Sequence, residues 1–113
     1  SLNLERNLIG DEGVKIIAQS PRFSHLIALN LWKNKVSAEG AKSIANSLVL
    51  VNLERLDLAQ NKIMDEGGRA LAESETLAAL KYVDLFGNEI GEETKAAMKE
   101  SSNFKALQHL VLE

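Results

Sequence analysis

The chain has 113 residues, no cysteine and a formal net charge of −3. Without cysteine it forms no disulfide or thiolate metal site, and without a basic surplus it lacks the electrostatic signature of a nucleic-acid-binding protein. No apolar run approaches the roughly 18 residues of a membrane-spanning helix, so we expect no membrane association. The absence of cysteine and of a visible signal peptide favours the cytoplasm but leaves the compartment open.

The sequence repeats itself every 27 residues without insertion or deletion between copies. Asparagine stands at positions 7, 34, 61 and 88, and leucine at 26, 53, 80 and 107 and at 4, 31, 58, 85 and 112. A unit of this size cannot bury its own apolar side. The copies are therefore expected to stack as the coils of a solenoid.

Each copy predicts a strand, a turn, a helix and a return loop, in that order. Residues 1–5 form the first strand. In the second copy, Leu29 and Leu31 alternate with Ala28, Asn30 and Trp32, which is the pattern of a strand with one buried face. The turn follows at Asn34, and residues 38–47 have helical spacing. The expected apolar side of this helix is Ala41, Ile44, Ala45 and Leu48.

The third and fourth copies follow the same pattern, with a fourth helix expected over residues 92–101 and a last strand at 109–113. Acidic residues such as Asp11 and Asp65 stand in the expected first turn of each helix, where negative charge complements the helix dipole. A metal-binding role for them is the less favoured alternative. We expect the asparagine column to bond the polar groups of the turns, as a ladder between coils. The recurring serines at the helix ends are a further structural column.

We interpret residues 1–113 as a single solenoid of four 27-residue repeats plus a terminal strand. Solenoids end in capping repeats with a polar outer face, and neither end of this chain shows that pattern. The sequence thus predicts an internal fragment of a longer solenoid. Because an unpaired strand edge recruits other chains, we expect end-to-end self-association through the terminal repeats.

The string from Leu53 to Ile63, Leu-x-x-Leu-x-Leu-x-x-Asn-x-Ile, resembles the leucine-rich repeat family. The segments Asp11–Ala18 and Ala38–Ala45 resemble the helices of its ribonuclease-inhibitor-like subclass, and the 27-residue period resembles bacterial versions of it. The resemblance covers the whole chain. It implies a right-handed α/β solenoid, a horseshoe with a concave parallel β-sheet and convex α-helices. It also implies a protein partner on the concave face.

Residues that alternate with the buried leucines should face the concave side, where neighbouring strands lie about 4.8 Å apart. They fall into three columns. The columns are Ser1, Ala28, Arg55, Tyr82 and His109; Asn3, Asn30, Asp57, Asp84 and Val111; and Glu5, Trp32, Ala59, Phe86 and Glu113. The candidate partner-binding residues are Trp32, Phe86, Tyr82, Asp57, Asp84, Arg55, Asn30 and His109.

Trp32 and Phe86 are the centre of this hypothesis, because aromatic residues dominate binding hot spots. They should flank the small Ala59 across two strand spacings and form a shallow slot. We expect neither ring to find an intramolecular partner. The alternatives are that they are ordinary scattered exposed apolar residues, or that Trp32 lies flat on its neighbours as extra packing.

Asp57 and Asp84 are predicted to be adjacent carboxylates, which suits either an acid–base pair or an acidic strip that receives lysine or arginine from a partner. No nucleophile, oxyanion donor, phosphate loop or metal shell accompanies them, so we favour the strip and predict no enzyme activity and no cofactor. The predicted function is a protein–protein interaction module. The alternative is a scaffold within a larger enzyme or regulator, such as a ubiquitin-ligase effector or a GTPase-activating protein.

Overall fold

The computed structural model describes residues 1–104 and 107–113, in which strands and helices alternate along the chain. The strands are β1 (Leu2–Asn3), β2 (Ala28–Asn30), β3 (Arg55–Asp57), β4 (Tyr82–Asp84) and β5 (His109–Val111). The helices are α1 (Gly10–Gln19), η1 (Pro21–Phe23, a 3-10 helix), α2 (Ala38–Ala45), α3 (Met64–Ala72) and α4 (Glu92–Glu100). The predicted strand–turn–helix order is confirmed in every copy.

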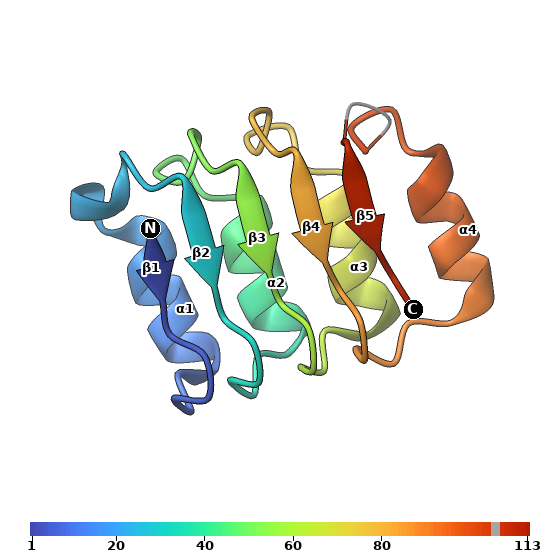
Figure 1. The fold of residues 1–113 in the computed structure, drawn as a ribbon, viewed down its shortest axis with the longest axis horizontal. Helices are drawn as coiled ribbons and strands as arrows, with labels where there is room; N and C mark the ends of the chain where they lie inside the picture. The colour runs from blue at the N-terminus through green and yellow to red at the C-terminus, as the bar shows by residue number, and fades with distance from the viewer. Residues whose placement is uncertain (105–106) are drawn as a thin grey trace.

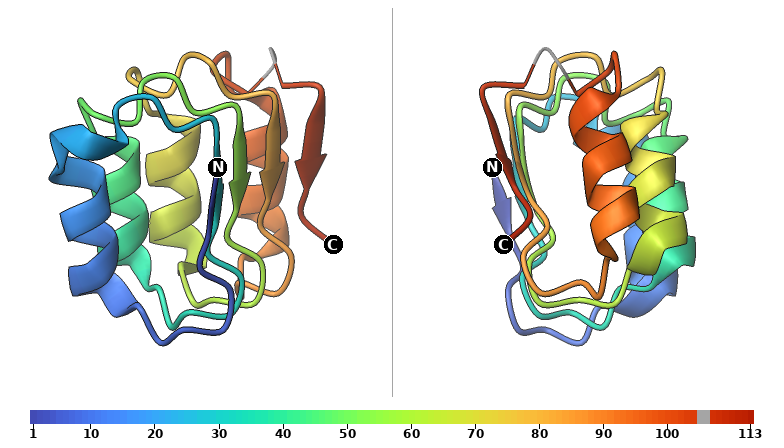
Figure 2. Two further views of the ribbon diagram at one scale, coloured as in Figure 1. Left: turned by 60° about the vertical axis from the view of Figure 1, so that its left-hand side comes forward. Right: turned by 90° about the vertical axis from the view of Figure 1, so that its right-hand side faces the viewer.

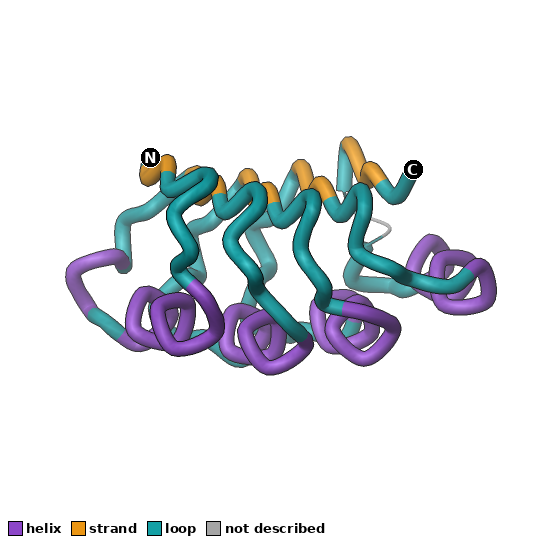
Figure 3. The backbone as a smooth tube through the Cα atoms, turned by 90° about the horizontal axis from the view of Figure 1, so that it is seen from below, coloured by secondary structure: helices purple, strands orange, loops and turns teal. Residues whose placement is uncertain are grey.

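The strands form one parallel sheet in the order β1-β2-β3-β4-β5, so each coil pairs with the next along the chain (Figure 1). The sheet is one layer and the α-helices form the other (Figure 2). In Figure 3 the row of helices is longer than the row of strands, which places the sheet on the inner side of the curve. The chain is an α/β solenoid, as predicted, and β1 and β5 are the edge strands of the described sheet.

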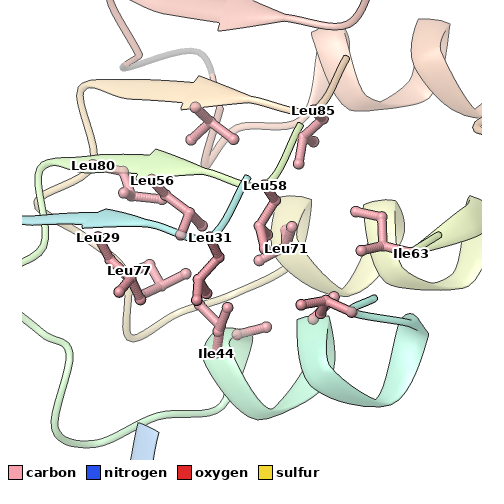
Figure 4. Packing of buried hydrophobic residues seen from close by; sticks show 14 of the residues in the cluster. Leu29, Leu31, Ile44, Leu56, Leu58, Ile63, Leu71, Leu77, Leu80 and Leu85 are labelled. Atoms are coloured by element: carbon pink, nitrogen blue, oxygen red, sulfur yellow. The ribbon is translucent and has the colours of Figure 1, made fainter. Parts of the chain in front are cut away.

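The core lies between the two layers and is built from the repeating apolar columns (Figure 4). Leu29, Leu56 and Val83 are directly paired across β2, β3 and β4, and all three are buried. Ile44 and Leu71 reach the same core from α2 and α3. Each coil therefore buries its apolar side against its neighbours, which a single coil could not do alone.

Leu48 corrects one part of the prediction. Helix α2 ends at Ala45, so Leu48 lies in the return loop and not on the apolar side of the helix. Its side chain is 81% exposed, whereas Ala41 and Ile44 are completely buried. Helical spacing from Ala41 and Ile44 predicted Leu48 on the apolar side, but Asn46 is the C-cap of α2 and ends the helix before Leu48.

The asparagine ladder, which we define as Asn34, Asn61 and Asn88, bonds each turn to the coil before it. The Asn61 Oδ1 atom accepts hydrogen bonds from the Asn34 and Val36 amides at 2.9 and 3.0 Å. Its Nδ2 atom donates to the carbonyls of Leu31, Leu58 and Ala59. The predicted ladder is thus confirmed for three copies, all of which are buried.

Asn7 is the exception in this column. It is exposed, and its side chain donates to the Glu5 carbonyl at 3.2 Å. The ladder residues serve the turn of the coil that precedes them, and no described coil precedes Asn7. The same residue type at the same repeat position therefore has a different energetic role.

Asp11 and Asp65, in the first turns of α1 and α3, act across coils. The Asp11 Oδ1 atom accepts from the Ser37 amide at 2.8 Å and from the Gly40 amide at 3.1 Å, and so caps α2 from the preceding coil. Asp65 accepts from the Gly91 amide at the start of α4 at 2.8 Å. This bond holds the pKa of Asp65 below its usual value. The sequence predicted that these carboxylates stabilise the dipole of their own helix. It did not predict their hydrogen bonds to the start of the next helix.

The serine column also joins neighbouring coils. The hydroxyls of Ser47, Ser74 and Ser101 donate to the carbonyls of Ala18, Ala45 and Ala72, near the end of the helix in the preceding coil, at 2.6–2.7 Å. The predicted structural role of these serines is confirmed. Together with the asparagine ladder and the acidic caps, they fix one coil relative to the next, which orients the exposed side of the sheet.

Candidate functional site

The sheet face, which we define as the exposed side of β2–β5 together with Trp32 and Phe86, is ordered by the strand register. Arg55, Tyr82 and His109 are direct neighbours across β3, β4 and β5. Asn30, Asp57 and Asp84 form a second row in the same way. The two rows match the first two predicted columns. Their role in binding stays a prediction.

The first row forms a continuous stack of charged and aromatic groups. The Arg55 guanidinium lies 4.2 Å from the centre of the Tyr82 ring. The Tyr82 and His109 rings have their centres 6.1 Å apart, at an angle of 55°. A guanidinium at this distance is attracted by the ring quadrupole. Arg55 is therefore held in place on the sheet while its charge remains exposed.

The second row has a structural role that the sequence analysis missed. The Oδ1 atoms of Asn30, Asp57 and Asp84 accept from the amides of Trp32, Ala59 and Phe86 at 2.9–3.0 Å. Each bond joins a residue to the amide two positions later, the pattern by which Asn and Asp stabilise turns. The signal was the run of Asn or Asp at positions 3, 30, 57 and 84.

The electrostatics of the second row nevertheless suit a cationic partner. Partial burial raises the pKa of Asp57, and the neighbouring charges of Asp84 and Glu5 raise it further, against the lowering effect of the Ala59 amide. Burial also raises the pKa of Tyr82, with Asp84 and Asp57 adding to the effect. Negative charge is thus concentrated beside the Arg55 stack. A lysine or arginine that approached Asp57 would relieve this repulsion.

Trp32 has an intramolecular partner, contrary to the prediction. The Arg6 guanidinium lies 4.7 Å from the centre of the indole ring, and the Lys33 ammonium lies 6.0 Å from it. Trp32 is accordingly half-buried. Sequence reasoning missed the contact because Arg6 and Trp32 are 26 positions apart and neither belongs to a repeating column.

Phe86 is the more open of the two predicted anchors, with 45% of its surface exposed. The Lys33 amide donates to the Ala59 carbonyl, and the Gln60 amide donates to the Phe86 carbonyl. These bonds place residues 32, 59 and 86 at equivalent positions of successive coils. Ala59 is almost completely buried. Its small side chain therefore lies between the larger side chains of Trp32 and Phe86 without filling the space between them.

Asp57 and Asp84 each accept a backbone amide, and this contact is fully explained by the turns. Within residues 1–104 and 107–113, no group of three or more His, Asp or Glu side chains has the geometry of a metal site. In the same residues, no helix has the length and apolar character needed to cross a membrane.

Comparison with known families matches the Leucine Rich repeat model to residues 1–18, 24–45 and 49–72. These segments cover more than half of the chain, which belongs to the leucine-rich repeat family. Repeats of this family are generally protein-interaction modules, and domains built from them are typically without catalytic activity. A comparison with curated proteins gives no match. The fold and the family therefore define a class of binding protein without naming a partner.

Proposed function

We propose that the chain is a protein-binding module that recognises its partner on the sheet face. The observation that supports this most is the Arg55–Tyr82–His109 stack, in which three non-repeating side chains lie on adjacent strands. Tyrosine and arginine are enriched among interface hot spots. Because the stack is ordered without a partner, binding costs less side-chain entropy than it would with free side chains.

The arrangement also supports a proposal for the chemistry of the partner. Asp57 and Asp84 would receive a lysine or arginine, and Asn30 would bond a polar group beside it. Phe86 and Trp32 would contact apolar or aromatic side chains on the same partner surface. An interface of this kind has an apolar centre with charged groups around it. The partner we propose is a folded protein with basic and apolar side chains side by side.

The test is capture of partner proteins by the tagged chain, with identification by mass spectrometry and a dissociation constant measured for each candidate. The Trp32→Ala/Phe86→Ala double variant should bind the true partner at least about tenfold more weakly, as expected for loss of hot-spot residues. Its unfolding free energy should fall by about 1 kcal/mol or less, because both side chains are partly exposed.

The matched control is Ile16→Ala/Leu48→Ala, which removes two exposed apolar side chains away from the sheet. Ile16 is 66% exposed and Leu48 is 81% exposed. The control should keep wild-type affinity. A partner whose affinity falls with the control pair and not with the sheet-face pair would refute the proposal.

We further propose that the repeats belong to the ribonuclease-inhibitor-like subclass. The support is that each described coil carries an α-helix of eight to ten residues opposite its strand. Such a module would also supply the recognition step of a larger enzyme or regulator, because binding on the sheet requires no catalytic residue of its own.

A further inference from the structure

The turns that follow the strands form a second surface, which we call the basic rim. A groove runs along these turns, and it carries four exposed cationic side chains and one exposed carboxylate. The cations are Arg6, Lys33, Lys35 and Lys62, and the carboxylate is Glu89. They come from four successive coils, so the stacking of the solenoid gathers charges that are distant in sequence.

The basic rim stands out because the chain as a whole is acidic. The net charge is −3, yet this groove has a local surplus of positive charge. Within the described residues, none of the four cations takes part in an ion pair, whereas Lys42, Lys81 and Lys95 each pair with a glutamate. Like charges gathered on one surface repel each other. An acidic ligand would remove that repulsion.

The groove also offers apolar contact beside the charges. Leu8 lines it and is 70% exposed, and the buried Val36 lies in its floor. An exposed leucine among cations suits a ligand that carries both carboxylates and an apolar side chain.

We propose that the basic rim binds an acidic segment of a protein, with carboxylates facing Lys33, Lys35 and Lys62 and an apolar side chain on Leu8. Charge complementarity identifies this occupant. A nucleic acid fits less well, because a phosphate backbone has no apolar side chain to place on the exposed Leu8. The basic rim meets the sheet face at Trp32, whose ring Arg6 and Lys33 contact. The inference rests on the cations of the turns and does not depend on the proposal for the sheet face.

The test uses a fluorescent glutamate-rich peptide of about twelve residues that contains one leucine, titrated into the complete chain and followed by anisotropy. Wild-type protein should bind the peptide, and raising the salt from about 50 mM to about 300 mM should weaken binding. The Lys33→Glu/Lys35→Glu/Lys62→Glu variant should lose at least about tenfold in affinity, since like charges then oppose each other. In labelled protein, the amide resonances of Leu8, Gln60 and Gly87 should shift.

The matched control is Lys15→Glu/Arg22→Glu/Lys99→Glu, which changes the net charge equally at exposed positions of α1, η1 and α4. It should keep the affinity within about twofold. Circular dichroism of both variants checks that they fold like the wild-type protein. The proposal is overturned if the two triple variants lose affinity equally or if the peptide does not bind. It is also overturned if a single-stranded oligonucleotide of equal charge binds more tightly than the peptide.

Discussion

The asparagine ladder and the sheet face are both polar, but they differ in what the polar groups contact. The side chain of Asn61 is buried and its bonds go to five backbone groups of the protein. Arg55 is exposed and contacts the face of one ring. The ladder repeats in residue type, and the first row of the sheet face, which holds Arg55, Tyr82 and His109, does not. Positions that build the solenoid must repeat because each coil has the same turn to satisfy, whereas positions that recognise a partner are free of that requirement.

The largest loss of unfolding free energy should come from a substitution in the asparagine ladder. Asn61→Ala removes the partners of the Asn34 and Val36 amides and of buried carbonyls. A buried unsatisfied group costs about 1–3 kcal/mol, so the unfolding free energy should fall by about 3 kcal/mol or more. Chemical denaturation with a two-state fit measures it.

Asn7→Ala is the control for this change, since it alters the same repeat position at an exposed site. Its effect should stay within about 0.5 kcal/mol, as for ordinary surface substitutions. Equal losses in the two variants would show that the asparagine column does not act through buried backbone bonds.

The cross-coil caps should give the next largest effect. Asp11→Ala removes the carboxylate that accepts from the Ser37 and Gly40 amides, and loss of a helix cap costs about 1–2 kcal/mol. Glu12→Ala, next to it and exposed, should cost a few tenths of a kcal/mol through the helix dipole alone. Thermal and denaturant unfolding distinguish the two. A loss at Glu12 as large as that at Asp11 would contradict capping across coils.

A substitution on the sheet face should change the unfolding free energy by a smaller amount and in the opposite direction, as a gain in stability. Burial raises the pKa of Asp57, so the folded protein binds that proton more tightly than the unfolded chain does. Stability is therefore lost as the pH rises from the ordinary aspartate pKa of about 3.9 through the raised folded value. Asp57→Asn keeps an oxygen for the Ala59 amide, as Asn30 does for the Trp32 amide. Because asparagine does not titrate, the variant should not lose stability as the pH rises.

The variant should be more stable than wild type near neutral pH by up to about 0.5 kcal/mol, because solvent screens a partly exposed carboxylate. The difference should vanish below about pH 3, where aspartate is protonated in both states. Unfolding curves across this pH range test the sign. A variant that is less stable at neutral pH would mean that the charge of Asp57 supports the fold.

The repeat columns predicted the fold closely because their spacing reports directly on which side chains each coil buries. Leu29, Leu56 and Asn61 were placed correctly on that basis. The Arg6–Trp32 contact and the reach of Asp11 to α2 were missed, because each joins neighbouring coils through side chains that the repeat pattern does not relate. The exposure of Leu48 depends on where α2 ends, and a spacing pattern fixes such an end poorly.

The candidate site was predicted in position but not in detail. Alternation along the strands placed Arg55, Tyr82 and His109 on one face, and the register confirmed their order. The turn role of Asp57 and Asp84 was not recognised, although Asn or Asp at that position in four copies was its signal. The basic rim was also missed, because its cations lie at non-repeating positions of separate coils.

The central claim is that the non-repeating side chains of the sheet face make the contact with the partner. Hydroxyl-radical footprinting of the complex with the captured partner tests it most directly, since aromatic side chains react readily when exposed. Oxidation of Tyr82, Phe86 and Trp32 should fall at least about threefold on binding, as expected for residues at the desolvated centre of an interface, while that of Ile16 and Leu48 stays unchanged. Protection of Ile16 and Leu48 with the sheet face still reactive would contradict the account.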